Sequence, residues 1–424
     1  MSIELLYFLV MVGVFIVCAF ALKLPVSLAM LAASEITLLI SGNGIGVRHL
    51  VEGSFSYLDT ILVIATAMIF MRTIQESGAL DALSVVIIRR FRNMPALLLP
   101  LLMILSMFPG MITGSSTASV LTAGAIVSPV LITLGMPRHT AGAFIAMAGI
   151  LGMIAPPVNI PAMLIGGGID MPYVGFGIPL LLMVMPLAVL FSWTFGLKFV
   201  KKMSWEDLAP KLNTEIYARY GARLFIPIAV VVALMILAQV SPSIFGWGLP
   251  VIFLLGAASG VFTGKRFNVL RAAKAALHDC LPVAGILAGV GMFIQVMTLT
   301  GVRGFIVVNA LSLSFNTALL YLAMAVTIPL FGAVSAFGAA SVLGVPFILA
   351  LLNQDQIITA AALSLIASLG DFMPPTALSA IFAAQVIGEP RYSYVLKKLI
   401  LPGLVIIAWG LVFITFSKQL RAIL

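Results

Sequence analysis

Two clusters of small polar residues interrupt stretches of the chain that are otherwise apolar. They read Thr-Gly-Ser-Ser-Thr at 113–117 and Ser-Ala-Phe-Gly at 335–338. Hydroxyls and carbonyls freed from helical bonding can coordinate Na⁺, and free N–H groups at a helix start can bind an anion. Such backbone is tolerated at membrane depth only when it is buried in protein or faces water. We therefore expect two re-entrant hairpins, over 95–135 and 316–353, with the binding groups at their tips.

A pair of prolines follows each cluster, at Pro156-Pro157 and at Pro374-Pro375. Proline has no N–H to donate and disfavours helical geometry at the residue before it, so two in succession interrupt a helix. The apolar segments around the pairs then become broken helices over 139–168 and 356–388. Each break offers two further half-helix ends that can meet a hairpin tip.

Asp371 lies three residues before Pro374, inside an apolar stretch. A carboxylate near the centre of a membrane helix costs about 2.5–3.5 kcal/mol on insertion scales, so its presence calls for an explanation. It can ligate Na⁺ or take up a coupling proton; alternatively, it caps the broken helix or reaches an aqueous loop. Arg72 and Glu76, four residues apart on one helix face, are expected to form a structural ion pair near the inner interface.

The elements that position these residues must be membrane helices. Of the 424 residues, 62% are hydrophobic and 9% are charged, whereas a soluble domain carries roughly 25% charged residues. Apolar stretches long enough to cross a hydrocarbon core of ~30 Å recur from end to end, and strand-like alternation is absent. The sequence therefore predicts an all-α polytopic membrane protein. The spanning helices are expected near 5–22, 24–41, 61–78, 139–154, 174–200, 223–240, 247–263, 281–300, 356–372 and 397–420.

The two halves of the sequence repeat each other. The Pro-Pro pairs are 218 residues apart, and Ala-Ser-Val-Leu at 118–121 recurs at 340–343. We expect repeats over 1–200 and 223–424, joined by a cytoplasmic interfacial linker at 201–222. Because a hairpin returns to its own side, each repeat makes an odd number of crossings, and the second repeat is then inverted.

The positive charges set the orientation of the chain. Predicted inner loops hold about 18 Lys and Arg residues and outer loops hold about four, a bias that places both termini outside. The first hairpin then enters from the cytoplasm and the second from the outside. The net charge of +9 is assigned to this orientation and not to nucleic-acid binding. Interfacial helices are expected where segments are too polar to span, at 79–92, 204–222, 265–278, 303–314 and 390–396.

These motifs resemble those of a known family. The run from Gly110 to Ala118, the Gly-Met-Ile-Ala-Pro-Pro ending at Pro157 and the Gly-Asp-Phe-Met-Pro-Pro at 370–375 look like the large membrane subunit of tripartite ATP-independent periplasmic (TRAP) transporters, in the ion-transporter superfamily. The resemblance covers nearly the whole chain. It implies Na⁺-coupled import of a small organic anion, of dicarboxylate or sugar-acid type, by an elevator motion in a bacterial inner membrane. It also implies two partners, a small four-helix membrane subunit and a periplasmic substrate-binding protein, and no organic cofactor.

The resemblance further implies which residues bind. One Na⁺ would lie between the first tip and the first break, and another between the second tip and the second break. The residues expected as Na⁺ ligands are Ser115, Ser116, Gly338 and Asp371. The full set expected to bind substrate or cation is Gly114, Ser115, Ser116, Thr117, Pro156, Pro157, Asn159, Ser335, Gly338, Asp371, Pro374, Pro375 and Thr376. The chain departs from the family at the second tip, which lacks an Asp-Pro-Thr-type sequence, at Val158, where Ser is usual, and at Asp371, where the family is usually apolar.

Other functions remain as alternatives at this point. The nearest is a stand-alone Na⁺- or H⁺-coupled organic anion symporter of the same architecture, which needs no binding protein. A channel would need a continuous polar pore lining, whereas the sequence offers two closed tips of small residues. An enzyme would need a nucleophile with a base, or paired acids, inside the bilayer. No Gly-x-Ser-x-Gly, His-Glu-x-x-His or paired membrane Asp motif is present, so we expect no catalytic residue.

Overall fold

The computed structural model describes residues 2–199, 212–312, 317–374 and 376–423. Within these ranges every regular element is helical, and eight helices are long and apolar enough to cross a membrane. The predicted fold class, an all-α polytopic membrane protein, is confirmed. The first half of the expected linker (201–211) and the first residue of the expected second hairpin (316) lie outside the described residues.

The first half of the chain contains two helices, a divided third segment, a hairpin, a broken helix and a last helix. In chain order these are α1 (Ile3–Ile16) with the π-helical turn η1 (Val17–Ala21), α2 (Val26–Ile40), α3 (Val47–Phe55), α4 (Leu58–Ser77), α5 (Ala79–Phe91), α6 (Pro95–Thr113), α7 (Ser116–Ser119), the π-helical turn η2 (Val120–Gly124), α8 (Ala125–Thr133), α9 (Arg138–Ile154), α10 (Ile160–Gly167), α11 (Gly177–Gly196) and the short turn η3 (Leu197–Phe199).

The second half shows a similar succession of elements, with the single helix α17 in the place of α3 and α4. In chain order these are α13 (Thr214–Tyr220), η5 (Gly221–Phe225), α14 (Ile226–Val240), α15 (Pro242–Phe245), α16 (Gly248–Thr263), α17 (Val269–Leu299), α18 (Val302–Ser312), α19 (Thr317–Gly332), α20 (Ala336–Ala339), the π-helical turn η6 (Ala340–Gly344), α21 (Val345–Ala350), α22 (Gln356–Ser368), η7 (Leu369–Phe372), α23 (Leu378–Ile387), α24 (Tyr392–Thr415) and α25 (Ser417–Ile423). The π-helical turns η2 and η6 occupy matching places after the two tips.

Two of the expected interfacial helices do not exist as separate elements. Residues 265–278 were expected to lie apart from a span at 281–300, but α17 runs unbroken from Val269 to Leu299, with Pro282 inside it. Most of the segment 390–396 likewise belongs to the start of α24, which begins at Tyr392. In both places polar residues form the first turns of a long helix whose remainder is apolar. Polar residues by themselves do not end a helix. Residues 47–55, for which no helix was expected, form α3.

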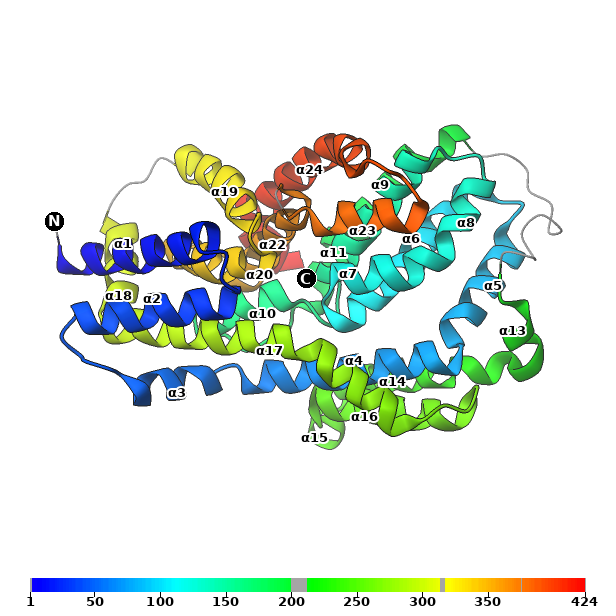
Figure 1. Cartoon of the computed structure of the whole chain (residues 1–424), viewed down its shortest axis with the longest axis horizontal. Helices are drawn as coiled ribbons and strands as arrows, with labels where there is room; N and C mark the ends of the chain where they lie inside the picture. Colours follow the sequence, from blue (N-terminus) through cyan, green and yellow to red (C-terminus); the bar gives the residue numbers. More distant parts are fainter. Residues whose placement is uncertain (1, 200–211, 313–316, 375, 424) are drawn as a thin grey trace.

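The helices form two groups (Figure 1). We call α1–α4, α14, α16 and α17 the scaffold, because these helices pack against one another. We call the two hairpins, the two broken helices, α11 and α24 the core unit, which packs mainly within itself. At its centre lie α9 and α22, where every residue of 140–154 and of 358–368 is buried. A helix that is apolar and buried on all sides belongs in the middle of a bundle, and small residues let its neighbours approach closely.

Candidate substrate and cation site

The first hairpin tip is a sharp turn between two helices. Gly114 ends α6 with a positive φ of 66°, a conformation that glycine adopts without strain, and its N–H donates to the Gly110 carbonyl at 2.7 Å. Ser115 then caps the next helix, because its Oγ accepts a hydrogen bond from the Ala118 N–H at 3.2 Å. The non-helical backbone of the tip is thus stabilised by the small residues Gly114 and Ser115 themselves.

Ser119 ties the two arms of the first hairpin together. Its Oγ accepts a hydrogen bond from the Gly110 N–H at 2.7 Å and donates to the Met107 carbonyl at 3.2 Å. Its side chain is fully buried. Ser119 was not among the predicted site residues, although a hydroxyl just after the tip is visible in the sequence. Its role here is to hold the hairpin closed.

The first break lies directly against the first tip. The backbone is extended at Ala155, and the peptide bond between Pro156 and Pro157 is cis. Past the prolines, the Val158 N–H donates to the Met111 carbonyl in the hairpin at 3.1 Å. The two elements that the sequence predicted to meet are therefore joined by a main-chain hydrogen bond.

Asn159 holds the break from the inside. Its Oδ1 accepts from the Ala162 N–H at 2.9 Å, which caps α10, and its Nδ2 donates at 2.9 Å both to the Ile154 carbonyl and to Ser364 Oγ. The side chain is fully buried. Asn159 thus satisfies groups freed by the break and connects the first broken helix with α22 of the second.

The second tip repeats the cap of the first. Ser335 Oγ accepts a hydrogen bond from the Gly338 N–H at 3.3 Å. Gly338 lies against the scaffold, where a Cβ at this position would sit 3.5 Å from Val26 Cγ1 and 3.7 Å from Phe15 Cζ. Phe15 also stacks on Phe331 of the hairpin, with ring centroids 5.3 Å apart. The second tip is therefore covered by apolar side chains of α1 and α2.

The second break is fastened to the second tip, as in the first half. Thr376 Oγ1 donates to the Ala333 carbonyl at 2.6 Å. Beside it, the backbones of Gly332 and Gly370 touch, so that a Cβ on either residue would lie 2.6 Å from the Cα of the other. Only glycine permits this approach of hairpin and broken helix.

A further side-chain contact, besides that of Asn159 with Ser364, crosses between the two halves of the core unit. Ser116, at the first tip, donates a hydrogen bond through Oγ to Oδ2 of Asp371, in the turn η7 before the second break. The exposed fractions of these residues are 2% and 8%. Among the described residues no three His, Cys, Asp or Glu side chains gather to hold a metal ion. A cation bound here would therefore use one carboxylate together with hydroxyl and carbonyl oxygens.

A cavity of about 340 Å³ opens beside the first tip, between it and the scaffold helices α4 and α17. Ser115 and Thr117 line it from the tip, as does Thr113, and Arg72 and Gln75 line it from α4. Small-molecule pockets generally measure about 300–1,000 Å³. The first tip thus faces a space of ligand size.

The other expected site residues lie elsewhere. Pro374 is exposed and lines an apolar groove with residues of α19 and α24, and Pro156 and Pro157 line a separate cavity with α14 and α16. Pro375 lies outside the described residues. Ser116 and Asp371 are therefore the expected Na⁺ ligands that the fold brings into contact, with Ser115 adjacent to Ser116 in the chain.

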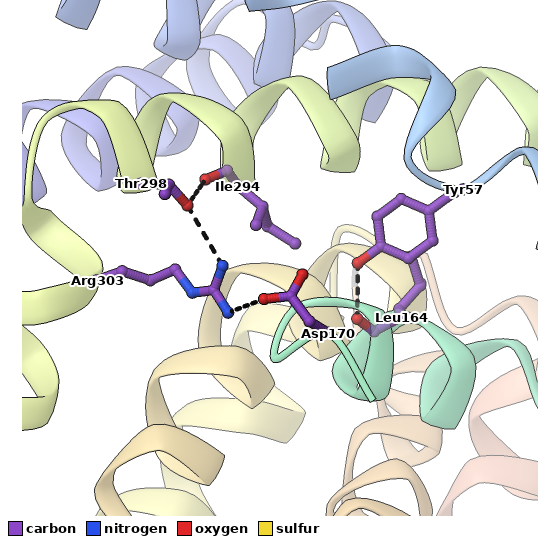
Figure 2. Close-up of polar contacts among 6 residues, drawn as sticks. All are labelled: Tyr57, Leu164, Asp170, Ile294, Thr298 and Arg303. Carbon is purple, nitrogen blue, oxygen red and sulfur yellow. Dashed lines mark hydrogen bonds and ion pairs between the residues drawn. The ribbon is translucent and has the colours of Figure 1, made fainter. Parts of the chain in front are cut away.

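Two polar contacts join the core unit to the scaffold side at the end of α10 (Figure 2). Arg303, at the start of α18, places Nη2 2.8 Å from Oδ2 of Asp170, and its Nη1 donates to Thr298 Oγ1 at 3.3 Å. Tyr57, just before α4, donates through its hydroxyl to the Leu164 carbonyl at 2.9 Å. Tyr57 is buried, whereas the Asp170 side chain is 79% exposed.

Hairpin tips that meet broken helices inside an all-helical membrane protein define the class of secondary transporters built on discontinuous helices. A family model described as "Tripartite ATP-independent periplasmic transporter, DctM component" matches residues 12–420. The chain therefore belongs to the DctM family, a family of transporters and not of enzymes. In TRAP systems this component functions with a small membrane subunit and a periplasmic binding protein.

The fold is also similar to that of a solved transporter. The YdaH transporter of Alcanivorax borkumensis, whose structure is described as having an unusual topology, superposes with a TM-score of 0.61 at 17% sequence identity. The match covers 88% of this chain and 89% of that chain. At this identity the likeness shows the fold alone. No curated protein sequence matches this chain.

Proposed function

We propose that this chain is the large membrane component of a Na⁺-coupled importer of a small organic anion, of dicarboxylate or sugar-acid type. The observation that carries the proposal is the contact of Ser116 with Asp371. It places a carboxylate and a hydroxyl together where a hairpin tip meets a helix break. Hard oxygen ligands at a broken helix are the arrangement by which such transporters bind their coupling ion.

The anion would bind next to this cation, on the cavity side of the first tip. Ser115 and Thr117 offer hydroxyls there, and the helix that runs over 116–133 begins at this point. Its start contributes free N–H groups and the positive end of the helix dipole. Inward movement of each Na⁺ down a potential of 100 mV releases roughly 2.3 kcal/mol, which would drive accumulation of the anion.

The proposed motion is a displacement of the core unit along the scaffold. The two tips differ in this conformation, because the first faces the cavity and the second is covered by Phe15 and Val26. With both termini in the periplasm, as the positive charges favour, the open tip is the cytoplasmic one and the conformation faces inward. The second repeat would then be inverted relative to the first, and the linker at 201–222 would lie in the cytoplasm of a bacterial cell, next to its inner membrane.

We propose a small four-helix membrane subunit and a periplasmic substrate-binding protein as partners. The test uses proteoliposomes that hold this chain with both partners and receive an inward Na⁺ gradient and labelled succinate, malate or gluconate. Uptake that requires Na⁺ and the binding protein is expected. Equal uptake with Na⁺ replaced by K⁺ would refute Na⁺ coupling, and undiminished uptake by this chain alone would instead support a stand-alone symporter.

A further inference from the structure

Arg72 lines two cavities. It is carried by the scaffold helix α4, and with Gln75 it lines the cavity beside the first tip. It also lines a second cavity of about 380 Å³. We call this second cavity the basic vestibule, because its charged lining consists of Arg72, Glu76, Lys265, Arg266 and Arg271. Four cations therefore line the basic vestibule beside one carboxylate, Glu76. The first-tip cavity adds one further carboxylate, Asp279 of α17, across from the hydroxyls of Ser115 and Thr117.

The ion pair of Arg72 with Glu76 exists, as the sequence predicted, but it does not account for an arginine at this place. Arg72 Nε lies 3.3 Å from Glu76 Oε1, and the two side chains are 38% and 40% exposed. Pairs with this exposure contribute about 0–1 kcal/mol to stability, so stability alone gives little reason for an arginine here. A guanidinium has five N–H donors, and one contact through Nε leaves donors for a ligand.

We propose that Arg72 binds the carboxylate of the transported anion after it leaves the first tip, before it passes into the basic vestibule. The inference rests on the proposed function and adds a scaffold residue to the anion's path. A guanidinium matches a carboxylate in geometry and charge. Glu76 competes for the same guanidinium, so the anion is held weakly enough to depart.

The position of Arg72 makes this contact specific to one conformation. Ser115 and Thr117 belong to the core unit and Arg72 to the scaffold. In the proposed motion the distance between them changes, and they share a cavity only when the first tip is at its inner position. The same basic lining would also suit a lipid phosphate. We favour the carboxylate because Arg72 also lines the cavity of the polar first tip.

The test compares four variants of the full-length purified chain: Arg72→Gln, Arg72→Lys, Glu76→Gln and Lys274→Gln. Lys274 lies exposed on α17 and lines neither cavity, so its variant controls for the loss of one positive charge. Binding of succinate, malate and gluconate is measured by thermal stabilisation, with and without Na⁺. Melting without any acid and size-exclusion chromatography establish that each variant is folded.

Opposite effects of the Arg72→Gln and Glu76→Gln variants on acid affinity would distinguish anion binding by Arg72 from a purely structural ion pair. Arg72→Gln is expected to weaken acid binding about ten- to a hundredfold, as the loss of a charge-assisted hydrogen bond does. Arg72→Lys should recover part of the affinity, and Glu76→Gln should tighten binding several-fold because the guanidinium loses its competitor. Lys274→Gln should bind as the wild type does.

The other outcomes overturn the proposal in distinguishable ways. If an acid stabilises the wild type but Arg72→Gln and Glu76→Gln change its affinity in the same direction, or not at all, Arg72 has a structural role and the proposed function stands. If cardiolipin stabilises the wild type but not Arg72→Gln, while both proteins bind acids with equal affinity, the basic vestibule is a lipid site. If no acid stabilises the wild type with or without Na⁺, the proposed function and this inference fail together.

Discussion

Ser116 and Asp371 are separated by 255 positions in the sequence and are hydrogen-bonded to each other in the interior of the core unit. The first tip is thereby joined to the break that belongs to the second half of the chain. Each half also fastens its tip to its own break, through Val158 and Thr376. The candidate cation site is thus completed by both halves and by neither alone.

Replacement of Asp371 by Asn tests whether this carboxylate serves the coupling ion. Asp371→Asn keeps size and hydrogen bonding but removes the charge, so Na⁺-driven uptake in proteoliposomes should fall at least about tenfold. Asp355→Asn is the matched control, because Asp355 caps the start of α22 through Oδ1 and Asn caps equally well. Uptake by Asp371→Asn at the wild-type rate and with wild-type Na⁺ dependence would exclude the role in coupling.

Loss of the Asn159 side chain should destabilise the fold. Asn159→Ala leaves three buried partners, Ile154, Ala162 and Ser364, without their hydrogen bonds, at a cost of about 2–5 kcal/mol. Asn268→Ala removes an exposed cap of α17 and should cost about 1 kcal/mol. Thermal melting in detergent compares the two variants, and similar melting temperatures would contradict the role assigned to Asn159.

The contact of Gly332 with Gly370 should tolerate no side chain. Gly370→Ala would force its methyl group to within 2.6 Å of the Gly332 Cα, and backbone on both sides leaves no flexible group to yield. We expect poor yield and early melting. Gly13→Ala is the control, since nothing lies within 4 Å of a Cβ in that membrane helix. A Gly370→Ala protein as stable as Gly13→Ala would show that the two backbones separate readily.

The ion pair of Arg303 with Asp170 should favour the conformation described here. Asp170 is exposed, so the effect is at most about 1 kcal/mol, or roughly fivefold in an equilibrium. The rate at which a thiol reagent modifies a cysteine introduced as Ser115→Cys reports access to the first tip, and the native Cys18 and Cys280 are buried. Arg303→Glu should lower that rate, and Arg303→Glu with Asp170→Arg should restore it. Equal rates in all three proteins would contradict this role.

The hairpins and breaks were predictable because their signals are local. Proline pairs and small polar residues inside apolar segments act on the backbone where they stand, and the structure places helix ends near them. The pairing of Ser116 with Asp371 was not predictable, because it depends on how two halves of the chain pack. The continuity of α17 was missed for a different reason: its charged first turns looked like a separate interfacial helix, although no residue there ends a helix.

The site residues divide in the same way. Ser116 and Asp371 were both predicted as ligands from their residue types, but the contact between them was not predicted. Asn159 was expected to bind a ligand, but its amide is engaged across the break. Arg72 was interpreted as half of a structural pair, since its neighbour Glu76 is visible in the sequence. The first-tip cavity that Arg72 lines is formed partly by residues of another helix, and a sequence contains no sign of it.

The hydrogen bonds that fasten each tip to its own break, from Val158 to Met111 and from Thr376 to Ala333, have a consequence for leakage. A gap between a hairpin and its broken helix would connect the two sides of the membrane for small ions. Since these bonds lie within the core unit, the proposed displacement leaves them intact. In the proposed motion the barrier to proton and Na⁺ leakage would therefore move together with the proposed binding site, and we expect the ion gradient to be preserved.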